Sequence, residues 1–159
     1  MDSNPIDIYT IFDLNRFIIS KEIHADIIIR DGNIKSLGDI EKANGLFGLC
    51  DSNIEDLSNL KEVAGDFFIS SHTVHSKLKS LGNLEIIHGD LNLRYSDVED
   101  LGKLKKVEGN VNLRDTNIKN LGLLEFVGGD LFLPKRIEKE IDLTNIIING
   151  QVRFWNDSK

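Results

Sequence analysis

Three consecutive stretches decide the fold: LGNLEIIHGDLNLRYSDVED (residues 81–100), LGKLKKVEGNVNLRDTNIKN (101–120) and LGLLEFVGGDLFLPKRIEKE (121–140). They open at Leu81, Leu101 and Leu121, so successive copies are 20 residues apart. Each copy carries the core Gly-Asp-Leu-x-Leu or a close variant, in which apolar and polar residues alternate. Such alternation is typical of a β-strand with one buried face. A fixed repeat of this length predicts a solenoid, whose stacked turns bury one continuous core.

The repeat extends in both directions from these copies. Earlier turns begin at Leu37 and Leu57, and the 24 residues from Leu57 to Leu81 indicate an insertion of about four residues relative to the 20-residue repeat. The half-turn ADIIIRDGNIKS (25–36) precedes them, and GQVRFW (150–155) reads as a last strand. The solenoid is therefore predicted over residues 25–155, after an N-terminal cap at 1–24 and before a tail at 156–159. Seven parallel strands are expected, at residues 26–29, 46–49, 66–69, 90–93, 110–113, 130–133 and 151–154.

The segment before the coil, IDIYTIFDLNRFII (6–19), spaces its apolar residues roughly as one face of a helix does. Pro5 suits the first turn of a helix. Because a solenoid needs its first layer covered, this segment is predicted to be a capping helix. A helix lying on a membrane would carry basic residues on its polar face, whereas this one offers mainly Asp7, Asp13 and Arg16.

The repeat resembles the leucine-rich repeat family, whose signature is Leu-x-x-Leu-x-Leu-x-x-Asn/Cys-x-Leu. In the turn from Leu101, Val111, Leu113 and Ile118 take three of the apolar positions. The repeat length is similar to that of short bacterial repeats, and Val-x-Gly-Asp-Leu-x-Leu is similar to the L domains of growth-factor receptors. There are two departures: Val107 displaces the first Leu, and the usual Asn is replaced by Gly32, Ser52, Ser96 and Thr116. A parallel β-helix-like coil is therefore the alternative to the horseshoe that the resemblance implies.

Composition excludes several function classes. The chain has 159 residues, a formal net charge of −7 and one cysteine, Cys50. The acidic balance argues against a non-specific nucleic-acid binder. A lone cysteine excludes an internal disulfide and a multi-cysteine zinc site, and it suits a reducing compartment. The N-terminus has no basic region followed by an apolar one, and the longest apolar runs, such as residues 27–29, are too short to span a bilayer. A cytoplasmic location without membrane association is expected.

The exposed face of the predicted sheet is the expected contact surface. Because strand side chains alternate, the residues between the buried pairs form columns across the turns. Phe68 and Phe132 are expected to be exposed in one column, and Cys50 partly exposed in the next. Aromatic residues around an arginine-bearing polar centre are enriched at binding hot spots, although exposed phenylalanines also pack on each other or on a loop. The predicted binding residues of this face are Phe68, Asn92, Arg94, Asn112, Arg114 and Phe132.

The insertion adds His72 and His75 as candidate contacts, since insertions in solenoids often border the binding face. Their spacing suits a metal, but further ligands are not evident nearby, so a solvated loop is favoured. No metal and no cofactor are predicted.

A third feature is a column of aspartates, Asp66, Asp90 and Asp130. Carboxylates on adjacent turns suggest catalysis, but an Asp after a turn glycine also accepts local backbone hydrogen bonds. No paired His, nucleophilic Ser or phosphate loop accompanies them, so no enzyme is predicted.

The expected function is a protein-interaction module that binds a macromolecular partner, a protein of unknown identity, through the exposed sheet. The alternatives are a phage- or bacterium-encoded inhibitor that blocks a target protein, and a carbohydrate- or nucleotide-processing enzyme using the Asp column. Self-assembly through the last strand, around Val152 and Phe154, is a further alternative.

Overall fold

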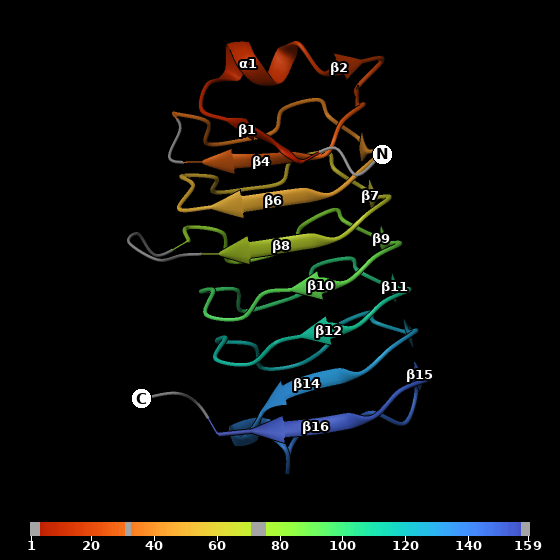
Figure 1. Cartoon of the computed structure of the whole chain (residues 1–159). Coiled ribbons are helices and arrows are strands. Elements are labelled where there is room, and N and C mark those ends of the chain that lie inside the picture. The colour runs from red at the N-terminus through yellow and green to blue at the C-terminus, as the bar shows by residue number, and fades with distance from the viewer. Residues whose placement is uncertain (1–3, 31–32, 71–75, 157–159) are drawn as a thin grey trace.

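The computed structural model describes residues 4–30, 33–70 and 76–156, which form a single coil of stacked turns (Figure 1). The coil makes about seven turns of about 20 residues, and each turn adds one strand to each of two sheets. Neighbouring strands are parallel, apart from the antiparallel pair of β2 (Ile18–Ile19) and β3 (Glu22–Ile23) at the start. The predicted solenoid of parallel β-strands is thereby confirmed.

Sheet A carries the predicted strands, one below another in Figure 1. Its register places equivalent repeat positions side by side, so that Leu91 pairs with Val111 and Val111 with Leu131. Each of the seven predicted strands begins one residue later than predicted, and the first strand of the sheet, Ile6–Ile8, was not predicted. In order, sheet A contains β1 (Ile6–Ile8), β4 (Ile27–Arg30), β6 (Phe47–Cys50), β8 (Phe67–Ser70), β10 (Leu91–Asn92), β12 (Val111–Asn112), β14 (Leu131–Pro134) and β16 (Val152–Trp155).

The return segments form a second sheet, sheet B, which lies behind and to the right of sheet A in Figure 1. This two-sheet coil is the parallel β-helix-like arrangement that the sequence left as the alternative to a single-sheet horseshoe. Sheet B contains β2 (Ile18–Ile19), β3 (Glu22–Ile23), β5 (Lys42–Ala43), β7 (Glu62–Val63), β9 (Ile86–Ile87), β11 (Lys106–Val107), β13 (Phe126–Val127) and β15 (Ile147–Ile148).

The N-terminal cap differs from the predicted continuous helix across residues 6–19. The helix α1 covers only Ile11–Asn15, where the Thr10 side chain caps it by accepting a hydrogen bond from the Asp13 N–H at 3.1 Å. The residues before it form β1, which extends sheet A because Ile8 fits the fully buried row beside β4. A short 3-10 helix, η1 (Lys135–Ile137), follows β14. Neither helix of the described residues is long and apolar enough to cross a membrane.

The core is a stack of equivalent apolar side chains, one layer per turn. Leu81, Leu101 and Leu121 head three of these layers and are at most 4% exposed. The glycine after each of them adopts a left-handed conformation, for example Gly82 at φ +57°. That conformation reverses the chain into the next segment, and the side chain two residues earlier accepts the glycine N–H, as Ser80 does at 3.1 Å.

Charged side chains also stack by repeat position on the outside of sheet B. The column Lys21, Glu41, Lys61, Glu85, Lys105 alternates in sign from turn to turn. The Glu41 carboxylate accepts hydrogen bonds from the Nζ atoms of Lys61, at 2.9 Å, and Lys21, at 3.0 Å. These two ammonium groups lower the pKa of Glu41 from 4.5 to about 2. Pairing each turn with the next one therefore places opposite charges side by side, whereas pairing a turn with the turn after next would place like charges side by side. The alternation thus favours the observed order of the turns.

Candidate binding face

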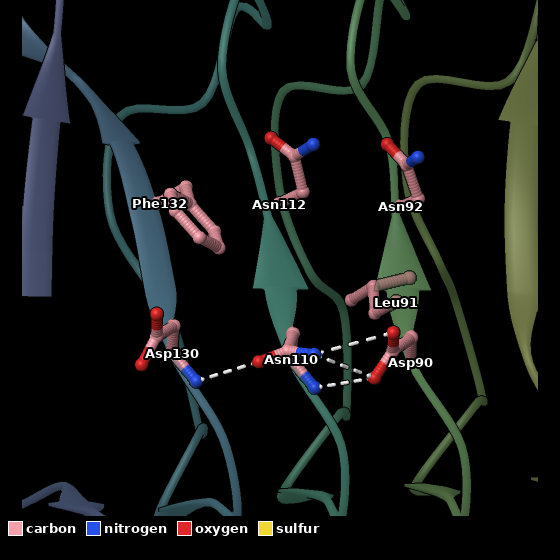
Figure 2. A pocket seen from close by; sticks show the side chains of 7 residues that line it. All are labelled: Asp90, Leu91, Asn92, Asn110, Asn112, Asp130 and Phe132. Carbon is pink, nitrogen blue, oxygen red and sulfur yellow. Dashed lines mark hydrogen bonds between the residues drawn. The ribbon is translucent and has the colours of Figure 1, made fainter. Parts of the chain in front are cut away.

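The aspartate column joins each turn to the next. The Asp66 Oδ1 atom accepts the backbone N–H of Asp90 at 2.8 Å, and Asp90 Oδ1 accepts that of Asn110 at 2.7 Å. The amide oxygen of Asn110 accepts the backbone N–H of Asp130 at 2.8 Å (Figure 2). Asp130 Oδ1 in turn accepts the backbone N–H of Gln151 at 2.8 Å. The expected backbone hydrogen bonds exist, but they link residues 20 or more positions apart instead of closing a local turn. One oxygen of each aspartate is therefore committed to holding the stack together.

A shallow open hollow of about 330 Å³ lies above this ladder, across β10, β12 and β14. Figure 2 shows the carboxylates of Asp90 and Asp130 and the amide of Asn110 along one end of it, and two further amides and an aromatic ring at the other. The Asn92 and Asn112 side chains each use their Oδ1 atom to accept the backbone N–H two residues on, at 3.1 and 3.3 Å. Their NH2 groups make no hydrogen bond with the described residues. The hollow is lined by Asp90, Leu91, Asn92, Asn110, Asn112, Asp130 and Phe132.

Phe68 lies on the same face but belongs to the packing of the earlier turns. Its ring covers Gly48 on the neighbouring strand, where a β-carbon would come within 2.3 Å of the ring. Phe68 and Phe132 are both partly exposed, and β10 and β12 separate them in the sheet. Exposure of both rings was expected; both are only partly exposed, and Phe68 fills the space that Gly48 leaves open.

The C-terminal half of the face gathers arginines and aromatic rings around Arg114. The guanidinium carbon of Arg114 lies 5.3 Å from the ring centroid of Phe132 and 5.0 Å from that of Trp155. Its Nε–H donates to the Asn112 side-chain oxygen at 3.0 Å. Arg153 stacks on Phe132 as well, at 5.9 Å. We refer to Asn112, Arg114, Phe132, Arg153 and Trp155 as the Arg114 patch.

Arg94 occupies the repeat position equivalent to Arg114, yet its charge is neutralised within the chain. Its Nε atom lies 3.2 Å from the Asp115 carboxylate of the next turn, whose side chain is 9% exposed. A terminal amino group of Arg94 also donates to the Tyr95 hydroxyl, and the guanidinium stacks on that ring. The structure therefore places Arg94 in an internal ion pair, and brings Asn92, Asn112, Arg114 and Phe132 together beside the hollow.

Cys50 is buried, with 7% of its surface exposed, where partial exposure was expected. All four residues of β6 are buried, and burial raises the pKa of the thiol. The candidate contacts His72 and His75 lie outside the described residues. Within the described parts of the chain, no three His, Cys, Asp or Glu side chains come close enough together to hold a metal ion.

Sequence reasoning missed Arg153 and Trp155 as members of the site. The sequence contained the information needed to find Trp155, because it occupies the same repeat position as Arg114, two turns later. Pro134 lies between them in this column of equivalent positions. Because Pro134 is compact and buried, the longer side chains of Arg114 and Trp155 contact each other across it. His88 was also passed over; its ring nitrogens lie 3.1 and 3.0 Å from the carboxylates of Glu62 and Glu108 on the side of sheet B.

No protein-family model, no curated protein and no solved structure matches the chain.

Proposed function

We propose that this chain is a protein-interaction module that binds its partner through the open face of sheet A. The observation that carries the proposal is the Arg114 patch, where a guanidinium stacks on two aromatic rings at the edge of a hollow. Arginine, tryptophan and other aromatic residues are the types enriched at the centres of protein interfaces. Trp155, at 45% exposed, offers a large apolar surface that a partner would cover.

The size of the face suits such a role. Eight strands about 4.8 Å apart give sheet A a length of roughly 34 Å. A standard interface needs about 800 Å² from each partner, which a face of this length supplies. The hydrogen bonds of the aspartates favour binding over catalysis, because Asp90 and Asp130 each use one carboxylate oxygen to accept a backbone N–H of the next turn.

Two narrower proposals accompany this one. The chain acts by blocking its target, as a small acidic inhibitor, which its net charge of −7 and its size favour. The second is that the repeat is a variant of the leucine-rich repeat. The buried Leu91 and Leu93, and the buried residues at the same positions of the other turns, support it.

A capture experiment with matched variants tests the proposal. The double variant Phe132→Ala/Trp155→Ala removes the rings of the patch, and Lys103→Ala changes an exposed residue of the return segment. We expect wild type and Lys103→Ala to retain the same protein from native lysate, and the double variant to retain at least about tenfold less. Thermal unfolding verifies that all three chains are folded. Equal capture by the three proteins would place the binding site away from this face.

A further inference from the structure

The geometry points to the chemistry of the partner: we infer that Arg114 is an anchor for a side-chain carboxylate of the bound protein. The inference rests on the proposed function, since it names what that same face recognises. Two rings and one amide hold the guanidinium plane, through the contacts to Phe132, Trp155 and Asn112. Only Nε is used as a donor, and the two terminal amino groups make no hydrogen bond with the described residues. A planar fork of this kind binds a carboxylate through two parallel hydrogen bonds.

Arg114 differs in this respect from the other arginines of the face. Arg30 pairs with Asp7 at 2.6 Å, and Arg94 with Asp115 at 3.2 Å. Arg153 donates to Gln151 at 2.9 Å and lies 3.7 Å from the Asp130 carboxylate. Among the residues that the structure describes, Arg114 has aromatic and amide neighbours but no carboxylate within ion-pair distance. A partner carboxylate would supply the missing counter-charge.

The surroundings of Arg114 strengthen an ion pair made there. The rings of Phe132 and Trp155 shield part of the guanidinium from water, and a covering partner would exclude more. Electrostatic attraction grows as water is excluded, while stacking holds the side chain in place before binding. Since the position of the fork is already set, little side-chain entropy is lost when the carboxylate arrives.

A protein carboxylate fits the site better than the phosphates of a nucleic acid. Asp90 and Asp130 line the neighbouring hollow, and their negative charges repel a chain of phosphates. The net charge of −7 adds to this repulsion. A single carboxylate at Arg114 avoids the aspartates, and the hollow beside it accepts hydrogen-bond donors from the partner, such as backbone N–H groups or a lysine.

Three peptide pools test the inference, each with random residues on both sides of one fixed central residue. The centre is glutamate in the first pool, glutamine in the second and phosphoserine in the third. Trp155 is the only tryptophan of the chain, so its fluorescence reports binding at the patch directly. The proteins compared are wild type, Arg114→Gln, Arg114→Lys, the matched control Arg94→Gln and the face variant Asn92→Ala/Phe132→Ala.

We expect the glutamate pool to bind wild type at least about tenfold more tightly than the glutamine pool. That preference should vanish in Arg114→Gln, weaken in Arg114→Lys and persist in Arg94→Gln. Equal binding of the glutamate and glutamine pools, tighter binding of the phosphoserine pool, or no binding of any pool would overturn the inference. If binding is lost in the face variant but unchanged in Arg114→Gln, the face binds without this anchor and the proposed function stands. Binding that no variant alters would overturn both the inference about Arg114 and the proposed function.

Discussion

The Oδ1 atom of Asp90 lies 2.2 Å from the point that a β-carbon on Gly109 would occupy. The same oxygen accepts the N–H of Asn110 at 2.7 Å, so the carboxylate bridges two turns at the corner between the sheets. The relationship recurs at Asp66 with Gly89 and at Asp130 with Gly150. These glycines are needed for close approach, because they lack the positive φ of the Leu-Gly turns. Aspartate and glycine therefore form one unit, although they come from successive repeats.

Replacing Gly109 with alanine should cost more stability than replacing a glycine that needs only its backbone conformation. A β-carbon there meets both Asp90 and the backbone of Gly89, and we expect a loss of about 2 to 3 kcal/mol. Gly82→Ala is the control, since its φ is +57° but its β-carbon meets nothing within 4 Å, and about 1 kcal/mol is expected. Urea unfolding of the two variants measures both losses. A smaller loss at Gly109 would mean that the corner yields to the extra atom.

Two buried hydroxyls of the same column should respond in opposite ways to removal. Thr116 donates to the Leu113 carbonyl at 2.7 Å, whereas the buried Ser96 hydroxyl has no hydrogen-bond partner among the described residues. We expect Thr116→Val to lower the free energy of unfolding by about 1 kcal/mol. Ser96→Ala should leave it unchanged or raise it by up to about 1 kcal/mol, because it removes an unsatisfied polar group. Destabilisation by Ser96→Ala would reveal a partner such as a buried water.

The Glu41 carboxylate should make stability depend on acid pH. Its hydrogen bonds to Lys61 and Lys21 lower its pKa from 4.5 to about 2 in the folded chain. A lowered folded pKa contributes stability that is complete above the unfolded value and is lost as the pH falls toward the folded one. Melting temperatures measured between about pH 5 and pH 2.5 should therefore fall less in Glu41→Gln than in wild type. Glu125→Gln, which removes a carboxylate without an ion pair to any described residue, should retain the slope of wild type.

Cys50 should be a poor nucleophile in the folded protein. It is 7% exposed, and burial raises the pKa of its thiol, so little thiolate is present at neutral pH. An aromatic disulfide reagent should modify the folded chain at least about a hundredfold more slowly than the urea-unfolded chain, since reaction requires local opening. Absorbance of the released thiolate follows the rate. Modification at the rate of the unfolded chain would show that β6 opens readily.

The positions of the turns followed from sequence because they depend on a pattern that repeats in the chain itself. Leu81, Leu101 and Leu121 recur at one interval, and any stack that buries all of them has the same register. The strand cores were placed to within one residue for the same reason. The N-terminal cap does not repeat, and its apolar spacing suits a helix as well as strands. Only the neighbouring β4 decided that Ile6–Ile8 would be a strand.

Sequence by itself thus determined the coil and the face on which Asn92, Asn112, Arg114 and Phe132 gather. It did not distinguish Arg94 from Arg114, which stand at the same position of consecutive repeats. The tertiary structure separates them, because Asp115 reaches Arg94 from the next turn while Trp155 reaches Arg114 from two turns away. Repeat position specifies where a side chain begins, whereas the ion pairs and ring contacts that it makes depend on which neighbours fill the space around its far end. That choice exists only once the turns are stacked.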